Sequence, residues 1–294
     1  MTGAHFLLTY ACSYECDHCF VHAGPHAGGT FTIGQIRDVL DELVKIGTIT
    51  TVYLEGGEPF QYYALMREGV ARASERGFDV GIVTNAYWAT TEEDAELWLR
   101  DLAALGLSRL TVSEGSLHFG DSKDTPARRA LAAAGKLGVP HGSICTERPA
   151  TKTDDEGRTV VDGGVMFRGR AAEKLTDGMP RRPAGEFTAC TREQLAEPGR
   201  VHLDAYGNVH VCQGISMGNM WDVPLSKLAA EYDAASHPIC GPLLSGGPVG
   251  LAGRYGVALD DGYVDECHLC YVARRALLDR FPAHLAPRQV YGLA

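Results

Sequence analysis

The stretch HFLLTYACSYECDHC, residues 5–19, joins a short apolar run to three closely spaced cysteines. Residues 5–9 have the length and composition of a buried strand. Cysteines follow at positions 12, 16 and 19, in a CX3CX2C pattern on the loop after this strand. In folds built from parallel strands, the loops at the carboxyl ends of the strands carry the functional residues. The stretch therefore predicts an α/β fold with a ligand site on its first loop.

The same alternation of apolar runs and amphipathic segments continues to about residue 170. The expected strands span residues 5–9, 51–54, 79–84, 109–113, 140–145 and 165–168, and the expected helices span residues 33–46, 64–76, 92–105 and 126–137. A repeat of about 30 residues suits parallel strands joined by helical crossovers. Six strands are too few to close an eight-stranded barrel, so we expect a partial, open six-stranded βα barrel of the TIM type.

The composition changes in the last third of the chain, where Gly and Pro become frequent, as in residues 240–250. Two short apolar runs, 201–203 and 209–212, flank a hairpin turn signal, and a helix is expected over residues 271–281. We therefore expect two domains. The first is a partial barrel over residues 1–175, and the second is a small cysteine-rich α+β domain over residues 176–294.

Charge and composition exclude several classes of protein. The chain of 294 residues has 27 basic and 37 acidic side chains, a net charge of −10, and no basic stripe, which disfavours nucleic acid as a partner. No apolar run reaches the roughly 20 residues of a membrane helix, and no signal peptide is visible. Nine cysteines, an odd number, argue against a disulfide framework. We expect a cytoplasmic protein whose thiols bind metal.

The three cysteines of the first loop can each ligate one iron of a single [4Fe–4S] cluster. They leave one iron open for a ligand from outside the protein. The alternative is a zinc ion with three protein ligands and an open fourth position. His18 could serve as that fourth ligand, although its place between Asp17 and Cys19 makes simultaneous chelation awkward.

The loop resembles the signature of the radical S-adenosylmethionine (radical SAM) superfamily, in which a ring, here His18, precedes the last cysteine of CX3CX2C. The segment EGGEP, residues 55–59, resembles the second hallmark of that family, which holds the methionine amino group of S-adenosylmethionine. The resemblance covers about residues 5–175. It implies that Cys12, Cys16 and Cys19 are catalytic cluster ligands, and that the cofactor is bound by Gly56, Gly57 and Glu58.

The resemblance also implies further cofactor contacts at the ends of later strands. The family places ribose and carboxylate contacts at positions that correspond to Thr84, Asn85 and Ser113, and it places a segment like residues 165–171, with Arg168, beside the adenine. Polar residues at strand ends are also common as turn or cap residues, and an arginine is often a surface charge. Both interpretations stay open for these four residues.

A second set of cysteines, Cys190, Cys212, Cys267 and Cys270, comes from three segments of the C-terminal part. Four thiolates can enclose one [4Fe–4S] cluster or one zinc ion. The spacing from Gly207 to Cys212 resembles the SPASM domain or its shortened Twitch form. No cysteine follows Cys270, which favours the Twitch form with one fully ligated auxiliary [4Fe–4S] cluster. Such a cluster carries electrons or organises the domain.

Two cysteines and two loop residues remain. Cys145 lies in an apolar strand and is expected to be a buried structural thiol. Cys240 is expected to be packed as well, with hydrogen-atom donation to a substrate radical as the alternative. Glu114 and His118, in the polar segment SEGSLHFG, are further candidates to line a substrate site.

The resemblance implies a reaction as well. A reductase such as flavodoxin or ferredoxin supplies an electron, S-adenosylmethionine is split, and the 5′-deoxyadenosyl radical takes a hydrogen atom from a small-molecule or peptide substrate. If the auxiliary cluster accepts the remaining electron, the result is oxidation. If a thiol returns a hydrogen atom, the result is epimerisation. If the radical attacks another atom, a new bond or crosslink forms.

The second set of four cysteines favours an oxidoreductase with the auxiliary cluster as electron acceptor. A peptide maturase or crosslinking enzyme, or a radical epimerase, is the alternative. The first cysteine stands at position 12, which leaves little room ahead of it for a leader-peptide recognition domain and disfavours the peptide substrate. An alternative of another class is a non-catalytic iron–sulfur or zinc protein.

Overall fold

Five parallel strands from the N-terminal half form one part of the central sheet. The computed structural model describes residues 1–293 and places these strands side by side in sequence order. They are β1 (Gly3–Thr9), β2 (Thr51–Gly56), β3 (Asp79–Thr84), β4 (Leu107–Glu114) and β5 (His141–Cys145). The first five predicted strands are confirmed, and the polar or glycine residues that follow them meet at the carboxyl edge of the sheet.

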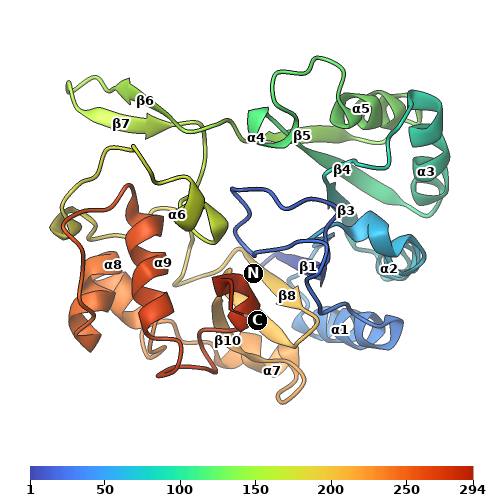
Figure 1. Cartoon of the computed structure of the whole chain (residues 1–294). Coiled ribbons are helices and arrows are strands. Elements are labelled where there is room, and N and C mark those ends of the chain that lie inside the picture. Colours follow the sequence, from blue (N-terminus) through green and yellow to red (C-terminus); the bar gives the residue numbers. More distant parts are fainter. Residues whose placement is uncertain (294) are drawn as a thin grey trace.

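Four helices cover one face of these strands (Figure 1). They are α1 (Ile33–Ile46), α2 (Tyr63–Glu75), α3 (Glu92–Ala104) and α5 (Pro126–Lys136), close to the predicted positions. The buried residues of α1, from Ile36 to Leu43, follow the spacing of one helix face. Thr32 and Gln35 form a capping box at its start, and Gly47 ends it with a φ of 74°. The larger hydrophobic core lies between these helices and the sheet.

The sixth predicted strand, residues 165–168, is wrong. Two glycines with positive φ, Gly163 and Gly164, precede it and turn the chain out of strand geometry, and the residues pack in a small separate cluster instead. Just before them, β6 (Ala150–Thr153) and β7 (Thr159–Asp162) form an antiparallel hairpin that projects from the sheet, at the upper left of Figure 1.

The sixth parallel strand is β8 (Arg200–Asp204), which pairs with β1 on the side opposite to β2. Its Val201 and Leu203 are fully buried and join the same core as β1. Two antiparallel strands, β9 (Asn208–Cys212) and β10 (Ile215–Asn219), continue the sheet beyond it. The sheet is open, in the order β10-β9-β8-β1-β2-β3-β4-β5. The α/β fold with a partial parallel barrel is therefore confirmed, although its strands come from both predicted domains and the division at residue 175 stays a prediction.

The other helices are short or belong to the C-terminal part. They are α4 (Ser116–Phe119), α6 (Arg170–Lys174), α7 (Leu225–Glu231), α8 (Cys240–Tyr255) and α9 (Glu266–Ala276), with 3-10 turns η1 (Pro59–Tyr62), η2 (Ala184–Glu186) and η3 (Arg288–Tyr291). Helix α9 starts earlier than predicted because Asp265 caps it by accepting a hydrogen bond from the backbone N–H of His268. Cys267 and Cys270 therefore lie within its first turns.

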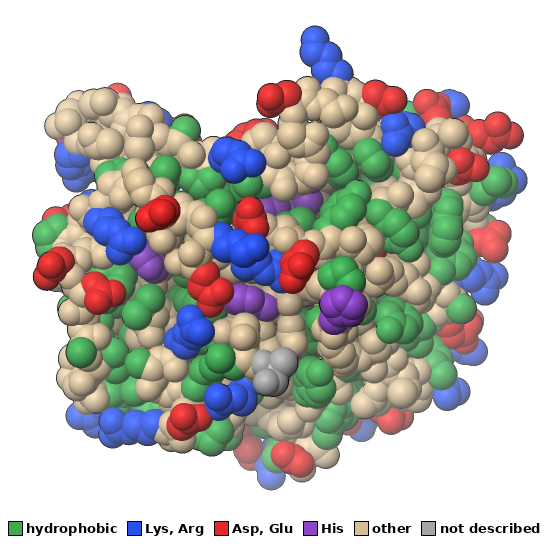
Figure 2. All heavy atoms as spheres, viewed as in Figure 1, with side chains coloured by type: hydrophobic (Ala, Val, Ile, Leu, Met, Phe, Trp, Pro, Cys, Tyr) green, Lys and Arg blue, Asp and Glu red, His purple; other side chains and the backbone are tan. Residues whose placement is uncertain are grey.

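Surface charge and helix length are the remaining features of the overall fold. On the face shown in Figure 2, acidic and basic side chains are interspersed over the surface, without a large patch of one sign. Among the described residues, none of the helices combines the length and the apolar character needed to cross a bilayer.

Candidate functional site

A cavity of about 280 Å³ opens at the carboxyl ends of strands β1 to β5. The structure brings most of the predicted site residues to its wall: Cys12, Cys16, Cys19, Gly56, Gly57, Thr84, Asn85 and Ser113. These residues come from the first loop and from the ends of β2, β3 and β4. Their convergence follows from the parallel sheet, because parallel strands present their carboxyl ends at one edge.

Backbone and side-chain N–H groups surround the thiols of the first loop. The Cys12 Sγ accepts hydrogen bonds from the Tyr14 backbone at 3.4 Å and from Asn85 Nδ2 at 3.5 Å. The Cys19 Sγ accepts from the Ala23 backbone at 3.3 Å. Burial raises the pKa of Cys12 to about 11 and that of Cys16 to about 12. Metal binding must therefore displace protons from these thiols, and the N–H groups then stabilise the thiolates.

Arg170, at the start of α6, holds the first loop from outside the cavity. Its guanidinium donates to the carbonyl oxygens of Cys16 at 2.6 Å and of Ala23 at 2.7 Å. Gly169 lies so close to Phe20 that a Cβ there would stand 2.5 Å from the Phe20 Cα. The sequence offered no signal for this contact, because Arg170 and Cys16 are far apart along the chain.

The three thiols of the first loop fit an iron–sulfur cluster in which one iron has no protein ligand. Three thiols share one cavity, and among the described residues that line it the only other cysteine, Cys145, lies on the far strand β5. The geometry also offers a metal-ligand group that differs from the zinc set expected from the three loop cysteines and His18. Ligand atoms of Cys16, His18 and His118 lie within 4.8 Å of one another. Both ligand sets therefore use Cys16.

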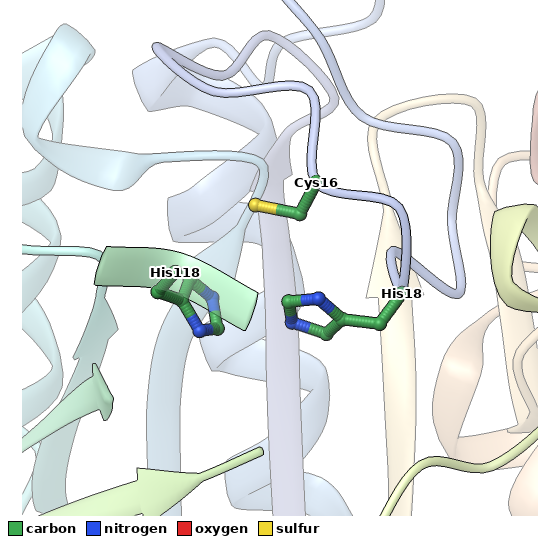
Figure 3. A group of neighbouring side chains, drawn as sticks. All are labelled: Cys16, His18 and His118. Atoms are coloured by element: carbon green, nitrogen blue, oxygen red, sulfur yellow. The ribbon is translucent and has the colours of Figure 1, made fainter. Parts of the chain in front are cut away.

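His18 and His118 both line the cavity and point toward each other, one from the first loop and the other from α4 (Figure 3). Their ring centroids are 4.4 Å apart, and the planes meet at 78°. Burial lowers the pKa of His18 to about 4, so that ring is neutral. The Nδ1 atoms of both rings are buried without a hydrogen-bond partner among the described residues. They can therefore bond to a polar ligand in the cavity.

The EGGEP segment is tied to the first loop through its backbone. Gly57 donates to the Thr9 carbonyl at 2.6 Å, and Glu58 donates to the Ala11 carbonyl at 2.8 Å. A Cβ on Gly57 would stand 2.0 Å from the Ala11 carbonyl oxygen. Gly56 has a φ of 131°, which side chains rarely tolerate. These two positions require glycine because two backbones meet there.

The side chain of Glu58 differs from the expectation, because it does not line the cavity. It is fully buried, and its carboxylate accepts hydrogen bonds from the Thr84 hydroxyl at 2.8 Å, the Asn85 backbone at 2.7 Å and the Phe60 backbone at 3.0 Å. Glu58 thus fixes the end of β3, and an ammonium contact through its carboxylate stays a prediction. Burial raises the pKa of Glu58 to about 7.

We expect this raised pKa to make Glu58 destabilising above neutral pH. The folded form holds the proton more tightly than the unfolded chain, so the contribution is favourable below about pH 4.5 and is lost as the pH rises through about 7. Relative to Glu58→Gln, the wild type should lose about 3 kcal/mol of unfolding free energy between pH 5 and pH 8. Denaturant unfolding of both proteins at the two pH values measures this; parallel pH profiles would contradict it.

The second set of cysteines also converges. Cys190, Cys212, Cys267 and Cys270 all line a smaller cavity between β9 and α9. Burial raises the pKa of Cys270 to about 11 and that of Cys267 still further. Two buried arginines, Arg168 and Arg274, line the same cavity and supply positive charge next to it. Four thiols with cationic neighbours fit either a fully ligated iron–sulfur cluster or a zinc ion.

Arg168 therefore lies in a different place from the one expected. Its guanidinium donates to the Cys212 Sγ at 3.0 Å and pairs with Glu193 at 3.3 Å, and it does not line the first cavity. The reason is the missing sixth strand, since residues 165–168 leave the sheet and cross toward the C-terminal part. A contact of Arg168 with the adenine stays a prediction that this placement does not favour.

Of the two remaining cysteines, Cys240 is packed as expected and Cys145 is not. Cys145 is exposed, lines the first cavity, and has its Sγ 3.1 Å from Glu147 Oε1. Its expected burial is wrong, because β5 is the edge strand of the sheet. Cys240 is fully buried in the C-terminal core and does not line the first cavity. Glu114 lies outside the lining and pairs with Arg128 at 3.5 Å.

A cluster of polar residues on three strands was missed. Glu55 of β2 lines the first cavity, His5 Nδ1 lies 3.1 Å from its Oε2, and His202 Nε2 lies 3.3 Å from its Oε1. Burial alone would raise the pKa of Glu55, but hydrogen bonds from His202 and His5 outweigh it and hold the pKa well below its usual range. Burial lowers the pKa of His202. The sequence could not reveal this cluster, because β8 was not expected beside β1.

Comparisons with known proteins give one family and several relatives. The model of the Radical SAM superfamily matches residues 6–145. YydG of Bacillus subtilis (strain 168), whose name assigns it provisionally to peptide biosynthesis, is 23% identical over 81% of this chain and 68% of its own length. The mycofactocin maturase MftC of Mycobacterium tuberculosis is 30% identical over 55% of this chain and 42% of its own length. A crystal structure of BtrN in complex with AdoMet and 2-DOIA covers 78% of this chain and 82% of that chain at 15% identity, with a TM-score of 0.48.

Proposed function

The chain belongs to the radical SAM superfamily, and we propose that it is an oxidoreductase acting on a peptide or another small polar substrate. Its cofactors are S-adenosylmethionine and iron–sulfur clusters. The observation that carries the proposal is the presence of two separate thiol sets, the three cysteines of the first loop on the first cavity and four cysteines on the second cavity. The second set provides a place for the electron that an oxidation releases.

In this proposal Cys12, Cys16 and Cys19 hold the first cluster. When bound, that cluster supplies the electron that splits S-adenosylmethionine and so produces a radical able to abstract hydrogen. The chain positions the reactants. Gly56 and Gly57 line the cavity and let the EGGEP segment pack against the first loop. Asn85 fixes the Cys12 thiolate, and the unpaired His18 and His118 nitrogens offer polar contacts. The cavity also shields the reaction from water.

Two features bear on the substrate class. The relatives include a protein named for peptide biosynthesis and one named as a maturase, which supports a peptide. The cavity wall contains one carboxylate, Glu55, and no lysine or arginine among the described residues, which favours a neutral or amine-bearing group over an anion. We therefore place a peptide alongside the small polar molecule as substrate, and a maturase or crosslinking reaction remains an alternative of equal standing. A flavodoxin or ferredoxin is the proposed electron donor.

The iron content per chain tests the proposal. After anaerobic reconstitution the wild type should hold about 8 Fe per chain and release 5′-deoxyadenosine under dithionite. Cys267→Ser should lower this to about 4 Fe while leaving cleavage of S-adenosylmethionine intact, because only the second cavity loses a ligand. Zinc in the second site of the wild type would remove the electron acceptor. A wild type that releases no 5′-deoxyadenosine would instead indicate a non-catalytic iron–sulfur or zinc protein.

A second candidate function is epimerisation, and the position of Cys145 favours it. The thiol lies on the first cavity, where a substrate radical would form, whereas Cys240 is buried elsewhere. The Cys145 S–H bond would break as a substrate C–H bond forms. The resulting thiyl radical would then take up one electron from a ferredoxin-type donor and one proton from solvent.

Alkylation checks whether the Cys145 thiol is accessible from the cavity. The hydrogen bond to Glu147, together with burial, raises the pKa of Cys145, so the thiol stays protonated and should react slowly with iodoacetamide at pH 7. We expect alkylation of Cys145 to become severalfold faster in Glu147→Gln and to be slowed by S-adenosylmethionine, with Cys240 unmodified throughout. Peptide mass spectrometry of the cluster-loaded protein measures both sites. Insensitivity of Cys145 labelling to S-adenosylmethionine would argue against its place in the working cavity.

A further inference from the structure

The His5, Glu55 and His202 side chains form a compact group of ligand atoms beneath the first cavity. They come from three neighbouring strands, β1, β2 and β8, which lie side by side in the middle of the sheet (Figure 1). Ligand atoms of the three residues all lie within 4.8 Å of one another. The exposed fractions are 18% for His5, 14% for Glu55 and 7% for His202. The group is therefore enclosed and held by backbone that cannot shift freely.

The chemistry of the set is that of a transition-metal site. Two imidazoles and one carboxylate bind zinc and the neighbouring divalent metals with bonds of about 2.0–2.2 Å. Around a tetrahedral ion with such bonds, ligand atoms stand roughly 3.4 Å apart. The observed spacings are close to this value, although they involve different carboxylate oxygens: His5 Nδ1 lies 3.1 Å from Glu55 Oε2, and His202 Nε2 lies 3.3 Å from Glu55 Oε1.

Hydrogen bonds leave one polar atom of this group unpaired. The His202 Nε2 lies 3.3 Å from Glu55 Oε1, and the amide nitrogen of Gln213 lies 3.2 Å from His202 Nε2 and 3.5 Å from His202 Nδ1. The amide can therefore donate to Nδ1 while Nε2 donates to Glu55. In the same arrangement the Gln213 Oε1 is buried without a partner among the described residues, and the residue is only 3% exposed. An unpaired polar atom this deeply buried carries a free-energy cost.

A bound cation would give the Gln213 oxygen a partner. The His202 nitrogen would then offer its lone pair to the ion, and a half-turn of the Gln213 amide would bring its oxygen to the same point as a fourth ligand. The carboxylate also lacks a permanent counter-charge, since no lysine or arginine among the described residues forms an ion pair with Glu55. The cavity wall includes Glu55, which provides a route of entry.

We propose that His5, Glu55 and His202, with Gln213, form a mononuclear site for a divalent transition-metal ion at the floor of the first cavity. The ion would join β8 to β1 and β2, and so connect the C-terminal part of the sheet with the strands that carry the first loop. It would be separate from both cysteine sets, since none of its ligands is a thiol. Such an ion binds whichever reaction the enzyme performs.

Equilibrium dialysis of the reconstituted holoenzyme against Zn²⁺, with zinc and iron measured in the same sample, tests the site. The wild type should take up one zinc per chain without losing iron. His202→Asn should bind zinc at least about 100-fold more weakly. His26→Asn, which replaces an exposed histidine, is the matched control and should bind like the wild type. Equal uptake by all three proteins, or uptake accompanied by iron loss, would overturn the site.

A second variant covers the case in which His202→Asn does not fold. His5→Asn alters the most exposed ligand of the set and should weaken zinc binding to a similar degree. Zinc should also raise the melting temperature of the wild type, because a ligand that binds only the folded state stabilises it. That increase should be absent in His5→Asn. A wild type that binds no zinc above background overturns the proposal without any variant.

Discussion

Replacing Cys16 with serine is expected to abolish release of 5′-deoxyadenosine and to lower the iron content from about 8 to about 4 per chain. Cys16 lines the first cavity together with Cys12 and Cys19, and no neighbouring cysteine of the described chain can replace it there, since Cys145 lies on the far strand. A serine oxygen is a poor ligand for iron in such clusters, so the first set would be left with two thiols. The loss should therefore be complete.

Two quantities are measured on one preparation of the Cys16→Ser variant: its iron content, and the 5′-deoxyadenosine that it releases after dithionite is added. The control is Cys240→Ala, which removes a buried thiol outside the first cavity and should keep both values. The remaining iron in Cys16→Ser should be lost on adding Cys267→Ser, because the two sets bind separately. Residual cleavage of S-adenosylmethionine by Cys16→Ser above the protein-free level would contradict the assignment of this cysteine.

Replacing Gly57 with alanine is expected to destabilise the protein by more than about 4 kcal/mol, enough to prevent soluble expression. The added Cβ would stand 2.0 Å from the Ala11 carbonyl oxygen and 2.6 Å from its carbon, and both atoms are backbone that cannot rotate away. Separation of the two segments would break the hydrogen bond from Gly57 to Thr9. It would also move the first loop away from the end of β2, so any folded fraction should bind little iron.

Gly142→Ala is the matched control. Gly142 lies in β5, and a Cβ there would meet nothing within 4 Å. We expect its unfolding free energy to stay within about 0.5 kcal/mol of the wild type. Denaturant unfolding and iron content, measured side by side for the two variants, give the comparison. If Gly57→Ala were as stable as Gly142→Ala, the close approach of the EGGEP segment to the first loop would be wrong.

Local patterns were enough to predict most of the N-terminal half. Apolar runs and helical periodicity located β1 to β5 and the four covering helices. A buried strand or an amphipathic helix can be predicted in this way because its pattern of apolar residues is visible within one short segment. The cysteine spacing and the EGGEP segment predicted a resemblance to the radical SAM superfamily. The model of that family then matched residues 6–145.

The same patterns gave wrong predictions where contacts between residues far apart in the chain determine the structure. Residues 165–168 look like a strand by composition, yet Gly163 and Gly164 turn them out of the sheet. Glu58 looks like a ligand residue by position, yet its carboxylate bonds to Thr84 and Asn85. Local composition records that a side chain is polar or apolar, but not which neighbour it meets.

The sequence by itself determined the parallel α/β fold, the two cysteine sets and the resemblance to the radical SAM superfamily. Only the tertiary structure decided that β8 pairs with β1, that Cys145 and not Cys240 faces the cavity, and that Glu55 lies between two histidines. The physical reason is the distance along the chain between the residues that interact. Strand and helix patterns depend on nearby residues, whereas pairing of strands far apart in the chain and the direction of a side chain depend on packing of the whole molecule.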